Sequence, residues 1–313
     1  MPIQPNADSV ITKTTYPDLL NKAIDVVWMR RDEVAGNVLG QFFDTQSKSE
    51  GLTHVISSVS SVLPLPIENE DTEALPYHAS APGFDKTFTV VNYRSGIRVT
   101  RTMIEADRFS KINQMISGQI KSAMRKDEYM RAAILNNAFT GDDGADAKDL
   151  CDDAHPQERT DMTSNTTWDN KSTGALTLAN LHALRLLTRK MTNEAGDPDP
   201  VMSNTLLVPE DLEQKANELV GATAKPEGAL NDPNVLIRGL KIVVSPYLSS
   251  ATQYYIFGDR QGENKGLHEI VLSDWSIMDN TPSNADIVID KRIRGVKTFG
   301  FTVSRNIFGS TGS

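Results

Sequence analysis

Carboxylates form the densest group of side chains in this chain that could do chemistry. Six aspartates lie within the stretch TGDDGADAKDLCDD: Asp142, Asp143, Asp146, Asp149, Asp152 and Asp153. Carboxylate oxygens suit hard divalent cations, but the stretch lacks the glycine at the sixth place and the glutamate at the twelfth of a calcium loop. We therefore expect a solvated loop. A weak divalent-cation site and a metal-dependent enzyme built on residues 142–153 stay open as alternatives.

The other reactive side chains do not form a catalytic set. Cys151 lies inside the acidic stretch, where neighbouring carboxylates raise the pKa of a thiol and argue against a nucleophile. His268-Glu269 has no second histidine four positions on, so the helix of zinc proteases is absent. The histidines are scattered: His54, His78, His155, His182 and His268. We expect no catalytic, cofactor-binding or metal-binding residue, and no enzymatic activity.

Charge and composition argue against several classes of protein, namely nucleic-acid-binding, disulfide-bonded, membrane-spanning and secreted proteins. The 313 residues carry a net charge of −9 and one cysteine. Nucleic-acid binders cluster Lys and Arg against phosphates, so general binding to nucleic acid is not expected. A single cysteine excludes an intrachain disulfide and suits a reducing compartment. No apolar run reaches the roughly 18 residues of a membrane span, and the N-terminus lacks the pattern of a secretory signal.

A long helix is predicted directly before the acidic stretch. Between Arg98 and Phe139 there is no proline and only one glycine, Gly118. The pattern predicts one helix over 102–137, about 36 residues and on the order of 54 Å long, with a weak surface ion pair between Asp127 and Arg131. Apolar residues recur every three or four positions, the spacing of one helix face: Ile104, Phe109, Ile112, Ile116, Ile120, Ala123, Met124, Met130 and Ile134.

A β-ribbon is predicted before this helix. Residues 62–67 read VLPLPI, and two prolines allow only an edge strand. Residues 69–83 form a polar loop tip, and residues 84–99 alternate between apolar and polar. Together they predict a long antiparallel two-stranded ribbon, which is only marginally stable in water and therefore needs a partner surface. Its apolar tip residues are Leu75, Tyr77 and Phe84.

The rest of the chain alternates short helices and strands. Residues 1–15 predict an irregular arm and residues 16–43 a helix. Further helices are predicted over 176–193 and, because proline favours the first helical position, from Pro209 to about Val220. Strands are predicted over 205–208, 240–245, 253–257, 268–272, 287–289 and 294–307. Helices and strands in this order indicate an α+β fold.

The succession of these elements resembles the major capsid proteins of tailed bacteriophages, which share the Hong Kong 97-like fold. The resemblance rests on the ribbon, the long helix, and TLLVPEDLEQKANEL (205–219) followed by GLKIVVSPYL (239–248). It covers nearly the whole chain. It implies an N-terminal arm (1–54), an E-loop (55–97), a P-domain (98–174) with its spine helix (101–137), an A-domain (175–280) and a return strand to the P-domain (281–313).

The resemblance also implies a function. The chain would be the major capsid protein, forming hexamers and pentamers of an icosahedral shell around the double-stranded DNA of a tailed phage. Portal, scaffolding and decoration proteins would be its other partners. It would be found in the virion after assembly in the host cytoplasm, without contact with a membrane. An encapsulin-type shell, which encloses enzymes in a cellular nanocompartment, is the alternative with the same fold.

The resemblance places residues of the ribbon at a subunit interface. E-loops of the family cross onto the adjacent subunit, so Leu75, Tyr77 and Phe84 are expected there. Some relatives crosslink a ribbon lysine to an asparagine of a neighbour. Lys86 and Asn306 match no bond-forming motif of the family, so no crosslink is expected.

Overall fold

The computed structural model describes residues 37–47, 51–59, 82–106, 109–141, 144–157, 167–193, 197–221, 239–279, 287–302 and 305–313. The predicted arm (1–15), most of the helix predicted over 16–43, the predicted strand over 62–67 and most of the loop tip lie outside these residues. The chain divides into two compact units. The first takes residues 1–37, 91–127 and 272–297, and the second takes residues 38–90, 128–271 and 298–313.

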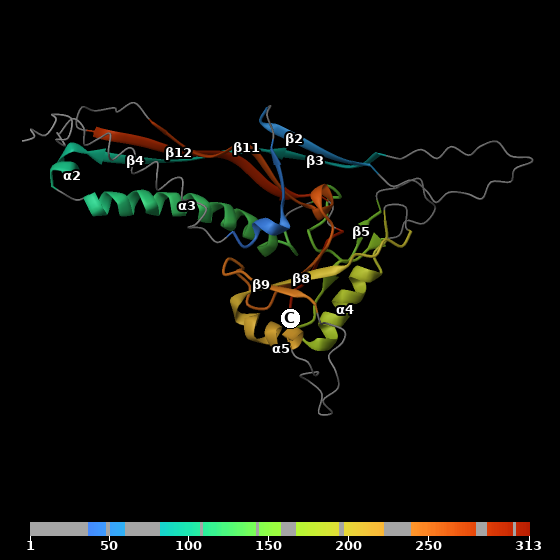
Figure 1. Ribbon diagram of the computed structural model, residues 1–313. Coiled ribbons are helices and arrows are strands. Elements are labelled where there is room, and N and C mark those ends of the chain that lie inside the picture. The colour runs from blue at the N-terminus through green and yellow to red at the C-terminus, as the bar shows by residue number, and fades with distance from the viewer. Residues whose placement is uncertain are drawn as a thin grey trace, which may run out of the picture. The chain divides into compact units, whose positions relative to one another are not determined.

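In the first unit, helix α3 packs against a pair of long strands (Figure 1). Strand β4 (Val91–Thr100) runs antiparallel to β12 (Ile287–Phe301), with Val91 opposite Lys297 and Thr100 opposite Ile287. α3 (Phe109–Asn136) buries Ile116, Ile120 and Ala123 of the predicted apolar face, because their spacing points them to one side of the helix. Residues of the strands complete this core: Ile97, Val99, Trp275, Ile289 and Ile293.

The single helix predicted over 101–137 is corrected to two helices. A short helix α2 (Arg101–Glu105) ends in a turn in which the amide of Ala106 donates to the carbonyl of Thr102 at 3.0 Å. The second helix, α3, runs without interruption through Gly118 to Asn136, about 42 Å at the usual rise. The sequence hides the interruption, because the apolar spacing continues from Ile104 to Phe109 and no glycine or proline marks the end of α2.

Strand β12 is continuous where the sequence predicts two separate strands, 287–289 and 294–307. The charged residues between the two ranges suggest the end of a strand, but in the structure they are paired with charges on neighbouring strands. Asp290 accepts from the Nε of Arg98 at 3.3 Å, and the Nζ of Lys291 lies 3.4 Å from Asp279 on β11 (Leu267–Asp279). Residues 307–310 form a strand of their own, β13 (Ile307–Ser310), in another sheet.

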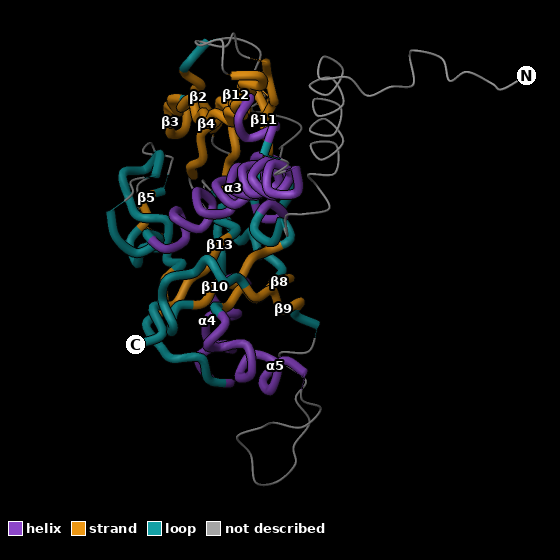
Figure 2. Tube along the Cα trace, turned by 90° about the vertical axis from the view of Figure 1, so that its left-hand side faces the viewer, coloured by secondary structure: helices purple, strands orange, loops and turns teal. Residues whose placement is uncertain are grey.

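The second unit is built on a five-stranded sheet in the order β7-β13-β10-β8-β9. Helices α4 and α5 lie on the same side of its strands in both views (Figure 1 and Figure 2). The bounds are β7 (Lys171–Ser172), β8 (Ser203–Val208), β9 (Lys241–Val244), β10 (Tyr254–Gly258), α4 (Leu178–Arg189) and α5 (Glu213–Gly221). The described residues of this unit also form the short 3₁₀ turns η3 (Gly40–Phe42), η4 (Glu210–Leu212) and η5 (Gly262–Lys265).

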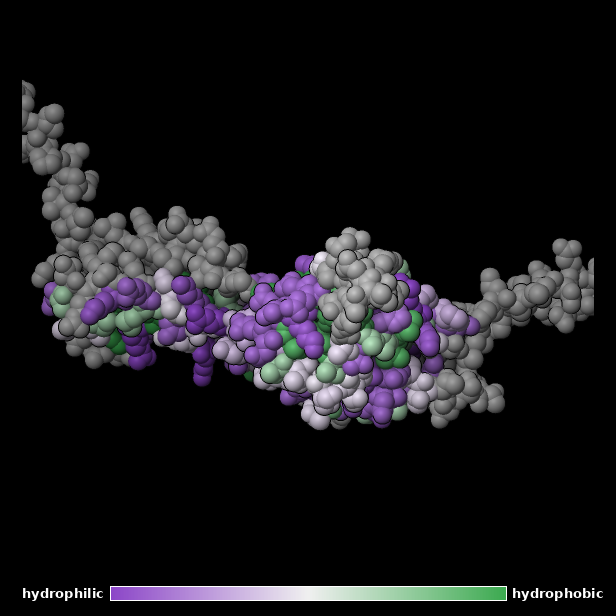
Figure 3. Space-filling model, turned by 90° about the horizontal axis from the view of Figure 1, so that it is seen from below, coloured by the Kyte–Doolittle hydropathy of each residue, from purple (hydrophilic) through white to green (hydrophobic). Residues whose placement is uncertain are grey.

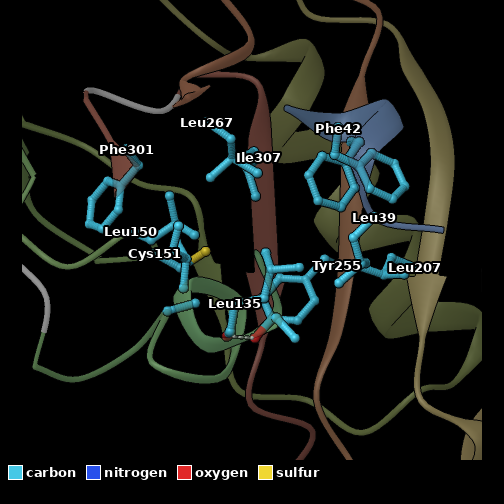
Figure 4. Packing of buried hydrophobic residues seen from close by; sticks show 14 of the residues in the cluster. Leu39, Phe42, Leu135, Leu150, Cys151, Leu207, Tyr255, Leu267, Phe301 and Ile307 are labelled. Carbon is cyan, nitrogen blue, oxygen red and sulfur yellow. Dashed lines mark hydrogen bonds between the residues drawn. The ribbon is translucent and has the colours of Figure 1, made fainter. Parts of the chain in front are cut away.

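The central strands of this sheet are buried on both faces. Side chains alternate between two apolar clusters, because successive residues of a strand point to opposite sides. Leu206, Tyr254 and Ile256 pack with α4 and α5 in one cluster. Leu207 and Tyr255 pack in the other, where the hydroxyl of Tyr255 donates to the carbonyl of Leu135 at 2.6 Å (Figure 4). Strands covered on both sides need the nearly continuous apolar runs that the sequence shows.

Candidate functional site

A two-stranded ribbon in the second unit leaves apolar side chains in water. Strand β2 (Thr53–Val59) pairs antiparallel with β3 (Pro82–Thr89), with Thr53 opposite Thr89 and Val59 opposite Pro82. On one face Val55 is 53% and Val59 67% exposed, and on the other Phe88 is buried. A single exposed valine on a protein surface is normal and needs no explanation. Two exposed valines on one face of an isolated ribbon indicate a surface that binds a partner.

The described part of the ribbon includes a strand that the sequence did not predict. β3 pairs with residues 53–59, where the β-branched residues Thr53, Val55, Ile56 and Val59 favour a strand. The predicted strand over 84–99 is interrupted at Val90, whose amide donates to the carbonyl of Leu52 at 2.9 Å. Beyond that point the chain enters β4 and pairs with β12, because side-chain alternation alone does not encode the partner of a strand.

The base of the ribbon is fixed to its own chain. Phe88 is 5% exposed, and its ring centre lies 6.2 Å from that of His268 on β11. A Cβ added to Gly300 would lie 2.4 Å from the Phe88 ring, so glycine lets β12 pass close to the ring. His54 contacts Gln46 Oε1 at 3.1 Å, on strand β1 (Asp44–Ser47), which pairs parallel with β11. The exposed valines are therefore held on an anchored support.

Of the three predicted interface residues, Phe84 alone lies within the described residues. Phe84 lies on β3 and is half-buried, and its amide donates to the hydroxyl of Ser58 at 2.9 Å. Leu75 and Tyr77 lie outside the described residues. Their place at an interface stays a prediction.

A buried ion cluster ties α3 to β11 within the second unit. The two terminal nitrogens of Arg131 donate to Glu128 and to Glu269, each at 2.6 Å, and all three residues are at most 7% exposed. Glu128 also accepts from the amide of Leu39 at 3.1 Å. Burial alone would lower the pKa of Arg131, but the two carboxylates outweigh burial and raise it. The cluster joins three segments that are far apart in sequence.

A second buried cluster lies in the first unit. Asp127 accepts from the indole nitrogen of Trp275 at 2.9 Å and from the ammonium of Lys297 at 2.8 Å. Lys297 is 2% exposed and lies over the Trp275 ring, with its nitrogen 5.4 Å from the ring centre. Asp127 and Arg131, predicted to form a surface pair, each belong to a buried cluster. One sequence signal could have predicted this burial: Asp127 and Arg131 occupy positions that continue the apolar face of the helix. A charge at such a position indicates a buried charge with a partner.

The acidic stretch is largely ordered and partly buried, so the expected solvated loop is corrected between residues 144 and 157. Asp146 is 8% exposed and accepts from the Nδ1 of His155 at 2.6 Å. The His155 ring stacks on Trp168, with the ring centres 4.1 Å apart. Asn170 donates to the carbonyls of Leu150 and Ile307 at 2.9 and 3.0 Å. The side chains of Asp146, His155 and Asn170 have hydrogen-bond partners within the fold. They therefore stabilise the connection after α3 and do not form an open ligand-binding site.

Cys151 is fully buried among apolar side chains (Figure 4). Burial raises the pKa of its thiol, and the nearby Asp169 and Asp149 add to this effect. A neutral, inaccessible thiol is inert. Among the described residues, no three His, Cys, Asp or Glu side chains are grouped so that they could hold a metal ion. No helix in the described part of the chain is long and apolar enough to cross a membrane.

The possible crosslinking residues occupy different settings. Lys86 lies on β3 opposite Ile56 and is half-buried. Asn306 is 3% exposed, and its side-chain oxygen accepts from the amide of Arg260 at 3.2 Å. A buried amide held by its own chain is poorly placed to react with a lysine of another copy.

Comparison with known proteins gives one family and several similar folds. A family model described as phage capsid protein matches residues 84–306, more than two thirds of the chain. The capsid of cyanophage P-SCSP1u superposes with a TM-score of 0.58 at 11% identity, over 88% of this chain and 88% of that one. The procapsid of bacteriophage JBD30 gives 0.54 at 13% identity, over 97% and 77%. No curated protein matches this sequence.

Proposed function

Because this chain belongs to the phage capsid protein family, we propose that copies of it build the icosahedral head shell of a tailed phage as its major capsid protein. The family match over residues 84–306 carries this conclusion. The fold is that of the JBD30 and P-SCSP1u capsids. The protein is therefore a structural protein of the virion capsid, and the family match favours a phage shell over an encapsulin-type compartment.

The ribbon supports a contact between copies. We assign the E-loop to β2, β3 and the residues between them, because the exposed valines of β2 need a cover. A neighbouring copy would supply that cover, and the anchored base around Phe88 would set the direction of the ribbon. Leu75, Tyr77 and Phe84 would extend the same contact toward the tip.

The other assignments follow from the elements. α3 would be the spine helix of the P-domain, and the five-stranded sheet with α4 and α5 the A-domain. Strand β12 would be the return of the chain to the P-domain. Hexamers and pentamers, a portal protein, and separate scaffolding or decoration proteins complete the proposal. The chain would enclose DNA without reading its sequence and would catalyse no reaction.

The test is assembly of the purified chain. The protein is produced in bacteria, separated by size-exclusion chromatography and imaged by negative-stain electron microscopy. Closed shells, or rings that close into shells, are the expected result. A stable 34.4 kDa monomer under all conditions, including in the presence of the phage's other head proteins, would contradict the proposal. Particles from infected cells should contain DNA and one portal vertex, whereas an encapsulin-type shell would contain neither.

A further inference from the structure

A small hollow lined by cations lies at one end of the second unit's sheet. It has a volume of about 160 Å³, room for about five water molecules at ~30 Å³ each, or for the end of one acidic side chain with some water. It lies where β8 and β9 begin and β10 ends, and Asn204, Thr205 and Gly258 line it. Its charged residues are Lys241, Arg260 and Lys265.

Among the described side chains, none balances the two lysines of the hollow. Lys265 donates to the carbonyls of Gln41 and Phe43 at 3.1 and 3.2 Å, and Lys241 donates to the side-chain oxygen of Gln41 at 2.9 Å. Within the described residues, neither lysine has a carboxylate within salt-bridge distance. Arg260 is paired with Asp199. Two ammonium groups that meet only neutral oxygens leave the hollow positive, so it attracts a carboxylate.

An acidic surface lies at the other end of the same strands. η4 follows the carboxyl end of β8 after one residue, and α5 follows η4. Their exposed carboxylates line a second hollow: Glu210, Asp211, Glu213 and Glu218. Lys215, the cation of α5, does not line it. Figure 3, which looks at this unit from the side of α4 and α5, shows hydrophilic surface in purple beside smaller apolar areas.

The two surfaces are complementary in charge and opposite in position. β8 and β9 are parallel, with Thr205 opposite Lys241 and Val208 opposite Val244. The cationic hollow lies at their amino ends, and the acidic surface follows their carboxyl ends, about 17 Å farther along β8 at the rise of a strand. One rigid sheet thus separates them, so a copy cannot satisfy its own hollow with its own acidic surface. A second copy can do so.

We propose that the acidic surface of η4 and α5 docks into the Lys241–Lys265 hollow of the next copy, head to tail. A contact between two different patches repeats from copy to copy and closes into a ring when the rotation allows. This inference rests on the proposed shell function and names one contact within it. Charge pairs at such a surface set partner and register, and their strength falls with added salt.

The test uses charge-changing substitutions in the full chain. Lys241→Glu places a carboxylate beside Lys265 and cancels the net charge of the hollow. Lys265 itself is spared, because it also donates to the carbonyls of Gln41 and Phe43. Glu213→Lys with Glu218→Lys leaves Glu210 and Asp211 beside two lysines and cancels the net charge of the acidic surface. Each variant is expected to lower the yield of shells roughly tenfold or more, since every contact then loses the net attraction between opposite charges. Lys215→Glu is the matched control on α5 and should assemble like the unaltered chain.

Combining the three substitutions places the new carboxylate of the hollow opposite the new lysines of the neighbouring copy. This exchange is expected to recover much of the assembly, which separates a lost contact from a lost fold. Variants that assemble like the unaltered chain would overturn the inference, as would a folded triple variant that stays unassembled. The shell function would stand in both cases, because the unaltered chain still assembles. If the unaltered chain itself never assembles, the shell function fails and this contact fails with it.

Discussion

His268 shows how one buried side chain makes the fold sensitive to pH. Its ring is inaccessible to solvent, and its Nε2 lies 3.0 Å from the hydroxyl of Thr302. Burial lowers the pKa of His268 to about 4, with Asp44 opposing and His54 reinforcing the shift. The unfolded chain therefore binds more protons than the folded chain between pH 4 and the usual value near 6.5.

Stability should accordingly fall as the pH falls through this window. We expect the unfolding free energy of the disassembled subunit to drop by about 2 kcal/mol between pH 7 and pH 5 from this group. His268→Gln should remove that part of the slope in urea titrations at the two pH values. His182→Gln, on α4, is the control and should show the same pH dependence of the unfolding free energy as the unaltered chain. An unchanged slope in His268→Gln would show that other groups set the pH dependence.

Arg131 makes a prediction about buried charge. Replacing it with methionine leaves Glu128 and Glu269 buried without their common partner. Loss of one member of such a cluster costs about 3–5 kcal/mol, so the urea midpoint of Arg131→Met should fall sharply. Arg125→Met, at an exposed position of the same helix, should change stability by no more than about 0.5 kcal/mol.

Removing the whole cluster is the decisive comparison. The combination of Arg131→Met, Glu128→Gln and Glu269→Gln leaves no charge in this cluster, and it should recover much of the lost stability. If Arg131→Met alone is harmless, the cluster does not hold α3 to β11.

At the scale of elements, Gly118 is a weak point of α3. It is exposed, and a Cβ added there meets no atom within 4 Å. Gly118→Ala should stabilise the subunit by about 0.5–1 kcal/mol, because alanine loses less backbone entropy in a helix. Thermal unfolding of the disassembled subunit measures this gain. A variant that is more stable but no longer assembles would indicate that a neighbouring copy passes close to Gly118.

Helix α4 depends on its cap. The hydroxyl of Thr177 accepts from the amide of Asn180 at 3.2 Å and satisfies one free donor of the first turn. Thr177→Ala should cost about 1 kcal/mol, whereas Thr177→Ser keeps the hydroxyl and should remain close to the unaltered chain. Equal losses in both variants would mean that the threonine methyl group, and not the cap, stabilises the helix.

At the scale of the whole molecule, the ribbon links folding to assembly. Val55→Asp with Val59→Asp places charge on a face that the chain itself does not cover. The subunit should keep its thermal stability, since these positions are exposed, while the yield of shells falls at least tenfold. Thr87→Asp, on β3 opposite Val55, probes the same face from the other strand. If both the double variant and Thr87→Asp form shells at the normal yield, the ribbon does not take part in the contacts between subunits.

The sequence by itself determined which residues face a core. The apolar spacing of Ile116, Ile120 and Ala123 and the continuous runs of β8 and β10 predicted buried faces, which the structure confirms. The α+β class and the resemblance to tailed-phage capsid proteins followed from the succession of these elements. Periodicity is a local property, since the side chains of one helix or strand point where the backbone geometry sends them.

Only the tertiary structure decided which distant segments meet. β3 pairs with residues 53–59, α2 ends before α3 begins, and Arg131 binds Glu269 in another part of the chain. Strand partners and buried ion pairs depend on contacts between distant residues, such as Asp127 and Lys297, which are 170 positions apart, and periodicity carries no information about them. Burial of Cys151 and His155 depends on such contacts as well. The neighbouring aspartates predicted a solvent-exposed loop, because the sequence does not show which distant residues bind them.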